Sequence, residues 1–349
     1  MGAVGPPLHN RWMTERPTSR SLLLRMQLNT FYSGPQAWFF LAEERGYLRD
    51  AGLAVEFTEG DTAANTVPKM AAGGFDVGYG DINALIAHAA NGFGNAPVAV
   101  FASYNASPYA IAVPAASSIC TPQDLAGKLL AAHPQDAAML LFPEFCKRTG
   151  LDATTVRIVI DAAPHSAMVR ELLAGKPGEP EQLVKWDGMF GFVNTLVAAS
   201  IDAGLEPNAL RCIQYHDHLP ELYGMALMVS RTLAATEPDT VIKLLRAFNR
   251  GLIDTVADPA AAIDALFKRN PAINRESNLR RLMGTLQLEM GRAEGGVLGI
   301  GDLDDARFAR GIDLLVTTKN LPHHPAAGEL FDRQFLPPLS ERVRSLVRV

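Results

Sequence analysis

The sequence predicts an α/β protein with two lobes, each a mostly parallel β-sheet flanked by helices, and a cleft between the lobes. Three observations lead to this prediction. Short apolar strand patterns alternate with helix patterns up to residue 104, the same alternation starts again after residue 120, and the chain is helical in pattern from residue 236 onward. Strands and helices that alternate through short loops are typical of parallel sheets covered by helices on both faces.

The first expected strand spans residues 22–30, and a tight loop then leads into a helix at 36–45 that stops at Gly46. Pro35 at the start of this helix and the glycine after its end match the usual asymmetry of helix termini. Asp81 can cap a later helix with its carboxylate. The other elements expected in this first series are strands at 53–57, 75–79 and 98–104 and helices at 61–70 and 81–90.

The second series repeats the first and is followed by a helical segment. Its expected strands are 129–132, 156–160, 186–190 and 212–215, and its expected helices are 135–150, 165–175 and 194–203. Further strands are expected at 109–113 and 225–229. Residues 175–185 are rich in Gly, Pro and Glu and are expected to be an exposed loop. The later helices are expected at 240–257, 259–267, 275–290 and 302–318, wrapped around the first lobe.

The domain organisation follows from this order of elements. We expect residues 1–20 to be a flexible tail, residues 21–104 and 222–349 to form a discontinuous first lobe, and residues 105–221 to form the second. The chain would then cross between the lobes twice, which is a hinge architecture. Ligands of parallel α/β sheets bind at the carboxyl ends of the strands. The loops at 33–36, 60–62 and 80–83 are therefore expected to converge on one site.

Composition excludes several classes of function. The 349 residues carry 32 basic and 37 acidic side chains and no recurrent basic cluster, so we expect no nucleic-acid partner. No run of 18 apolar residues occurs, so a membrane span is not expected. Cys120, Cys146 and Cys212 lie far apart, which indicates neither a zinc site nor a disulfide framework, although pairing of two of them stays open. No cofactor or metal is expected.

Three segments of the chain, found in order, resemble a known family. They are SGPQAWFFLAEERGYLRDAGLAVEF, GDTAANTVPKMAAGGFDVGYGDINALI and SPYAIAVPAASSICTPQDLAGKLLAAHPQD. They resemble the nitrate/taurine-type (NitT/TauT, SsuA-like) substrate-binding proteins of ABC transporters, which share a domain with the thiamine-pyrimidine synthase-like family. The resemblance covers about residues 22–230.

The resemblance implies a type II periplasmic-binding-protein fold that closes over a small molecule and delivers it to ABC permease and ATPase subunits. The ligands of such proteins range over sulfonates, nitrate, pyrimidines and aromatic acids. It also implies a periplasmic location, but the apolar run at 22–24 is far shorter than a signal-peptide core of about 7–15 residues, so a cytoplasmic location is the alternative. We expect a monomer.

The loop before the first helix supplies the first candidate ligand-binding residues, Ser33, Gly34, Pro35 and Gln36. Free N–H groups at a helix start favour an acceptor or an anion, although simple capping explains the same residues. Trp38 lies one turn further on, and its indole can stack on a flat ligand. Its aromatic neighbours equally favour a place in the core.

The next two strand ends supply Asp61, Thr62, Asp81, Ile82 and Asn83 as candidates. Both aspartates stand at helix starts, where capping alone accounts for them. If they face the cleft, their charge disfavours a sulfonate or nitrate and favours a neutral or amine-bearing ligand.

On the second lobe the candidates are His133, Gln135, Phe190, Phe192 and Asn194. The first two join a strand end to a helix start and can reach across a closed cleft. The two phenylalanines follow a strand in the corresponding loop, where an aromatic ring can form the other half of a sandwich.

The crossings between the lobes add Tyr104 and Asn105, because hinge strands commonly line such clefts. His216 and His218 are two residues apart, but without a third clustered ligand a metal site is not indicated.

The candidate loops contain no arginine, which argues against a fully charged oxyanion and favours a small planar, neutral or weakly charged aromatic ligand.

The alternative to a binding protein is a cytoplasmic enzyme on the same fold. A pyrimidine synthase of this kind carries a Cys-rich motif that is absent here, and a desulfinase needs a cysteine nucleophile where this chain has Ser33. A ligand sensor is a third possibility, although no output domain is apparent.

Overall fold

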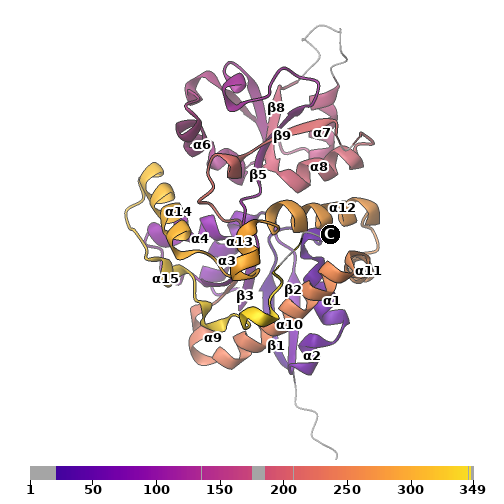
Figure 1. Ribbon diagram of the computed structural model, residues 1–349, viewed down its shortest axis with the longest axis vertical. Coiled ribbons are helices and arrows are strands. Elements are labelled where there is room, and N and C mark those ends of the chain that lie inside the picture. The colour runs from indigo at the N-terminus through magenta and orange to yellow at the C-terminus, as the bar shows by residue number, and fades with distance from the viewer. Residues whose placement is uncertain (1–20, 135, 175–184, 207, 345, 347–349) are drawn as a thin grey trace, which may run out of the picture.

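The computed structural model describes residues 21–134, 136–174, 185–206, 208–344 and 346, and it contains two five-stranded sheets in two lobes (Figure 1). The first sheet has the order β2-β1-β3-β10-β4. Its strands are β1 (Leu22–Gln27), β2 (Leu53–Thr58), β3 (Val77–Asp81), β4 (Val98–Ala102) and β10 (Met225–Val229). Only β10 runs antiparallel to its neighbours.

The second sheet repeats this arrangement in the order β7-β6-β8-β5-β9. Its strands are β5 (Tyr109–Pro114), β6 (Leu129–Ala132), β7 (Arg157–Ile160), β8 (Gly188–Phe192) and β9 (Leu210–Gln214). Here β5 is the antiparallel strand. In each sheet the antiparallel strand is thus the one that follows a crossing between the lobes. The predicted fold, two mostly parallel sheets flanked by helices, is confirmed.

Helices cover both faces of the first sheet. One face packs against α1 (Ala37–Glu44), α10 (Pro238–Ala257) and α11 (Pro259–Arg269), with the large aromatic rings of Trp38 and Phe248 in this core. The other face packs against α3 (Thr66–Ala71), α4 (Ile82–Ala90) and α14 (Asp305–Thr318). The short helices at the edges of this lobe are α2 (Tyr47–Asp50), α9 (Arg231–Thr236), α13 (Ala293–Leu298) and α15 (Ala327–Leu330).

The second sheet lies between α5 (Ala137–Leu140) with α6 (Phe142–Thr149) on one face and α7 (His165–Leu173) with α8 (Val193–Asp202) on the other. The helix predicted at 135–150 is therefore two helices. The second one starts with a proline in its first turn, where a missing N–H is tolerated, so the chain restarts the helix there.

The helix α12 (Arg275–Gly284) lies at the junction, where it packs against α8 of the other lobe (Figure 1). A single helix was predicted over 275–290. Instead, α12 continues into a π-helical turn at Thr285–Glu289. Such turns insert an extra residue into a helix and occur often at functional sites.

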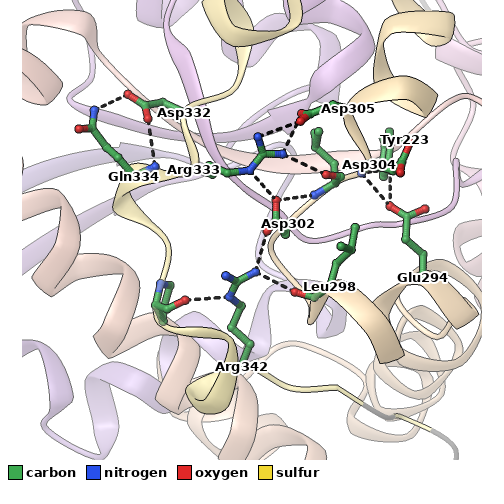
Figure 2. A network of polar contacts seen from close by, with 12 residues as sticks. Tyr223, Glu294, Leu298, Asp302, Asp304, Asp305, Asp332, Arg333, Gln334 and Arg342 are labelled. Atoms are coloured by element: carbon green, nitrogen blue, oxygen red, sulfur yellow. Dashed lines mark hydrogen bonds and ion pairs between the residues drawn. The ribbon is translucent and has the colours of Figure 1, made fainter.

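Figure 2 shows the polar contacts of the C-terminal segment, in which Glu294 accepts a hydrogen bond from the Tyr223 hydroxyl of the second crossing and the Asp304 N–H donates to that hydroxyl. Asp302 accepts hydrogen bonds from Arg342 at 2.9 Å and from Arg333 at 3.3 Å. Arg307 donates to two backbone carbonyls of the crossing, those of Pro220 at 2.7 Å and Leu222 at 3.0 Å. The crossing is therefore held by α14. In the described residues, no helix is both long and apolar enough to cross a membrane.

The close packing of α10 on α1 can be tested at Gly251. A Cβ atom there would lie 2.5 Å from the carbonyl oxygen of Trp38 and 2.6 Å from the Cβ of Ala42. In an open helix, replacing glycine by alanine raises stability by about 1 kcal/mol. Because the two helices must move apart, we expect Gly251→Ala instead to lower the free energy of unfolding by about 1–3 kcal/mol, measured by urea denaturation.

Gly328→Ala in α15 is the matched control, because a Cβ atom there meets nothing within 4 Å. This control is expected to keep or slightly raise the stability of the protein. A Gly251→Ala variant that gains stability would contradict the close packing of the two helices.

Candidate functional site

A cavity of about 430 Å³ lies between the lobes, and both lobes contribute to its walls. Its volume is in the range of small-molecule binding sites. The first lobe contributes residues 30–31, residues 61–64 and Arg281, and the second contributes residues 133–134, 136–137, 164–166 and several residues of 192–202. The carboxyl ends of β1, β2, β6, β7 and β8 therefore meet at one place, as the order of elements predicts.

Four of the residues predicted from the sequence line this cavity, namely Asp61, Thr62, His133 and Phe192. Gln135 lies outside the described residues. The remaining candidates lie elsewhere, in helix caps, in the core or in the contacts between the lobes.

Asp61 faces the cavity with its charge already engaged. Partial burial opposes ionisation, but Lys69 at 3.1 Å and hydrogen bonds from the Thr62 N–H and Asn65 hold the pKa of the Asp61 carboxyl to about 2. Thr62 caps the following turn by accepting from the Asn65 N–H at 3.3 Å. Asp61 and Thr62 thus stabilise the start of the following turn and also line the cavity, so both expectations from the sequence hold for them.

The loop at 33–36 does not line the cavity. Ser33 and Gln36 form a capping box, and the Gly34 N–H donates to Asn278 of α12 at 2.8 Å. These hydrogen bonds use the N–H groups that were expected to receive a ligand. Pro35 is buried with them and accepts a hydrogen bond from the Trp38 indole at 3.1 Å.

Trp38 and Phe190 were expected in the cleft, and the structure places both in cores. The Trp38 side chain is 1% exposed and packs edge-to-face against Phe248 and Tyr79. Phe190 is fully buried and packs against Phe142. Trp38 lies on α1 in the core between this helix and the first sheet, and Phe190 lies on β8 in the core under α6, where the burial of a large ring is favourable.

Asp81, Ile82 and Asn83 are likewise not among the residues that line the cavity. Ile82 is a core residue. The Asp81 carboxylate caps α4 and accepts a hydrogen bond from Tyr109 of the second lobe at 2.5 Å. The Asn83 amide donates to the Tyr109 hydroxyl at 2.9 Å and to the Tyr223 carbonyl at 2.7 Å. This cluster therefore fastens both crossings to the first lobe.

A second buried cluster joins the lobes around Glu289 in the π-helical turn. The Glu289 carboxyl is hydrogen-bonded to Thr285, to Asn194 of the second lobe and to Tyr104 of the first crossing. The Asn194 amide also donates to the Thr285 hydroxyl at 3.1 Å. Burial raises the pKa of the Glu289 carboxyl to about 7, although these hydrogen bonds lower it. Tyr104 and Asn194 are thus contacts between the lobes.

Asn105, the other crossing residue, is buried beside Arg292, whose backbone N–H donates to its side chain at 3.2 Å. His216 contacts its neighbour Asp217, and no group of three or more His, Cys, Asp or Glu side chains in the described residues can hold a metal ion. Cys120, Cys146 and Cys212 are free thiols.

The cavity also contains residues that the sequence did not indicate. His165 stacks on His133, with ring centroids 4.2 Å apart and planes at 16°. Burial, followed by the charge of His133, lowers the pKa of His165 to about 3, so this imidazole is neutral at physiological pH. Phe31 is 60% exposed at the wall of the first lobe. The guanidinium of Arg281 lies 5.8 Å from the Phe31 ring.

The stacked imidazoles and Phe31 offer flat surfaces, while Ser166, Thr30 and Thr195 offer hydroxyl groups. Phe31 follows a strand end and could have been found by the rule that located Asp61. Arg281 could not, because it comes from α12, whose position over the cavity is set by tertiary packing.

Comparisons with known proteins give one matching family model and several solved structures of the same fold. The family model described as NMT1/THI5 like matches residues 36–262. No curated protein matches the sequence closely enough to count as a relative.

Among solved structures, the alkanesulfonate-binding protein SsuA from Xanthomonas axonopodis pv. citri, bound to MOPS, is 16% identical with a TM-score of 0.62, over 88% of this chain and 96% of that one. A zinc-bound ligand-binding component of an ABC-type import system from Staphylococcus aureus is 12% identical with a TM-score of 0.63, over 93% and 100%. A mutant of the enzyme DSZB in complex with biphenyl-2-sulfinic acid is 13% identical with a TM-score of 0.57, over 90% and 97%. At these identities the likeness shows the shared fold.

The buried Glu289 predicts a pH dependence of stability. In the unfolded chain its carboxyl has the ordinary pKa of 4.5, and in the folded chain a pKa of about 7. Between these two pKa values the folded state keeps a proton that the unfolded state releases. The stability that the protonated Glu289 contributes is therefore fully present below pH 4.5 and is lost as the pH rises to about 7. The loss amounts to roughly 3 kcal/mol.

We expect Glu289→Gln, which stays neutral, to remove this loss. The free energy of unfolding of the variant, minus that of the parent, should rise by roughly 3 kcal/mol between about pH 5 and pH 8 in urea titrations. Taking this difference between variant and parent removes the pH dependence that the other titrating groups contribute to both proteins. His165 is one of them, and its lowered pKa makes stability rise with pH instead of fall. A difference that does not change with pH would contradict the raised pKa.

Proposed function

The chain belongs to the NMT1/THI5-like family, whose model matches residues 36–262, and we propose that it is a solute-binding protein that captures a small molecule between its lobes. The observation that carries this proposal is the cavity whose walls come from both sheets. A ligand there contacts both lobes only when they are closed. It therefore stabilises the closed state by the free energy of the contacts that the open state lacks. The domain boundaries that fit this mechanism are 21–104 with 222–349 and 105–221.

The walls of the cavity support a ligand with a flat, largely apolar body. Phe31 and Phe192 stand on opposite lobes, and the remaining apolar wall consists of small residues such as Ala63, Ala137 and Ala198. An aromatic ring can stack on an exposed phenylalanine and gain about 0.5–1.5 kcal/mol beyond the burial of its area. We therefore propose a planar, pyrimidine-like or aromatic solute.

The delivery of this solute to the permease and ATPase subunits of an ABC importer is the second part of the proposal. It is supported by the structural similarity to the ligand-binding component of an ABC-type import system from Staphylococcus aureus. We propose that the protein works in the periplasm as a monomer, with no cofactor.

A reaction at this site has less support. The desulfinase prediction requires a cysteine where this chain has Ser33, and Ser33 is 1% exposed and engaged in a capping box. None of the three cysteines is among the residues that line the cavity in the described part of the chain. The site therefore supports binding better than catalysis.

The test is native mass spectrometry of the purified full chain, followed by thermal shift with pyrimidines, aromatic acids, sulfonates and nitrate. We expect a small molecule that is retained, raises the melting temperature and is released unchanged on unfolding. A new product formed from any of these compounds during incubation would contradict the binding function.

Phe31→Ala is expected to weaken the binding of the retained or stabilising compound roughly tenfold, because the ring loses one apolar face of contact. Phe93→Ala is the matched control, since Phe93 is also 60% exposed and does not line the cavity. Equal losses in the two variants, measured by calorimetry, would place the ligand elsewhere.

A further inference from the structure

Arg281 is a half-buried cation in the wall of the cavity without a carboxylate partner. Within the described residues it has no ion pair within 4.0 Å, and its one hydrogen bond to them is a long one to the Thr195 hydroxyl, at 3.4 Å. Its Nε atom is buried and has no partner. Burial lowers the pKa of this guanidinium, which remains charged. A charge in such a place is costly unless an anion completes it.

The acidic groups near Arg281 do not supply this anion. Asp61 is paired with Lys69 at 3.1 Å, and Asp136 accepts from the backbone N–H groups of Ala138 and Met139 at the start of α5. Asp202 lines the same cavity and raises the pKa of Arg281 through space, but it is exposed at the end of α8 and lies more than 4.0 Å from the guanidinium nitrogens.

Glu289 is the remaining acid, and it acts on Arg281 only through space. Its carboxyl is already hydrogen-bonded to Thr285, Asn194 and Tyr104. Each nearby carboxyl is therefore either engaged with other groups or exposed to water, which leaves the guanidinium to an incoming group.

We propose that Arg281 binds an anionic group of the solute, so that the ligand is an aromatic anion, a carboxylate or sulfonate on a flat ring. This inference rests on the proposed binding function and specifies its ligand. The flat ring lies against Phe31, whose ring is 5.8 Å from the guanidinium, and the anion accepts from Arg281 beside the Thr195 hydroxyl. The Nε2 atom of His133, which is buried without a partner, is a further donor in the same cavity.

This assignment differs from the expectation of a neutral or weakly charged ligand. That expectation depended on the absence of arginine from the loops at the strand ends, and those loops do lack one. The cation instead comes from α12, which the fold brings over the cavity from the C-terminal part of the chain. Charge-assisted hydrogen bonds of an arginine to a carboxylate or sulfonate are about twice as strong as neutral ones.

The experiment compares matched probes on the full chain after bound material has been removed by unfolding and refolding. The probes are benzoate and benzenesulfonate as anions, benzamide as the neutral analogue and benzylammonium as the cation, and binding is measured by calorimetry and thermal shift. We expect the parent to bind at least one anion and to prefer it to both other probes. Arg281→Gln should weaken anion binding roughly tenfold to hundredfold.

Arg280→Gln is the matched control on the same helix, because Arg280 is exposed, pairs with Glu276 at 2.9 Å and does not line the cavity. It should bind the anions as the parent does. The ligand-free Arg281→Gln variant should be at least as stable as the parent, since it loses an unpaired, half-buried charge. A structural role for Arg281 would instead lower that stability.

Two results would overturn the assignment while the binding function stands: benzamide or benzylammonium binding as tightly as the anions, or an Arg281→Gln variant that binds the anions like the parent. Failure of all four probes, together with a neutral compound co-purified in native mass spectrometry, would overturn it in the same way. Failure of the probes with no retained compound, and no stabilisation by any solute tested above, would reject the binding function as well.

Discussion

The hydrogen bond between the Tyr109 hydroxyl and the buried Asp81 carboxylate is the interaction on which the arrangement of the two lobes depends. It joins the end of β3 in the first sheet to the start of β5 in the second, and Asn83 extends it to the backbone of the other crossing at Tyr223. Burial raises the pKa of Asp81, while the hydrogen bonds from Tyr109 and Asn83 oppose that rise. A buried acceptor of this kind must keep its donors, which fixes the two crossings relative to each other.

Other contacts between the lobes depend on this fixed arrangement. Once the crossings are set, α12 of the first lobe lies against α8 of the second, and the π-helical turn after α12 brings Glu289 to Asn194. The same placement carries Arg281 into the cavity wall. Because the walls of the cavity come from loops at the strand ends and from α12, a change in the angle between the lobes alters these walls without disturbing either sheet.

Local patterns in the sequence predicted much of the fold and a smaller part of the site. Strands 129–132 and 225–229 have the predicted bounds, because short apolar runs between polar residues or turns leave little choice of register. Asp61 and His133 were found from their positions after strands. The loop at 33–36 was misjudged because helix capping and ligand binding use the same N–H groups, and only the structure shows that Ser33, Gln36 and Asn278 take them. Arg281 depends on tertiary packing and has no local signal.

The order of strands also determines how the chain can be assembled during synthesis. All five strands of the second sheet lie within residues 109–214, so that sheet can form from a continuous stretch of nascent chain. The first sheet cannot, because β10 (Met225–Val229) fits between β3 and β4, which are made long before it. Until the ribosome has released that strand, β3 and β4 have unpaired edges that can join other chains. The ligand cavity can therefore form only after β10 has been made, when all strands of the second sheet have already been synthesised.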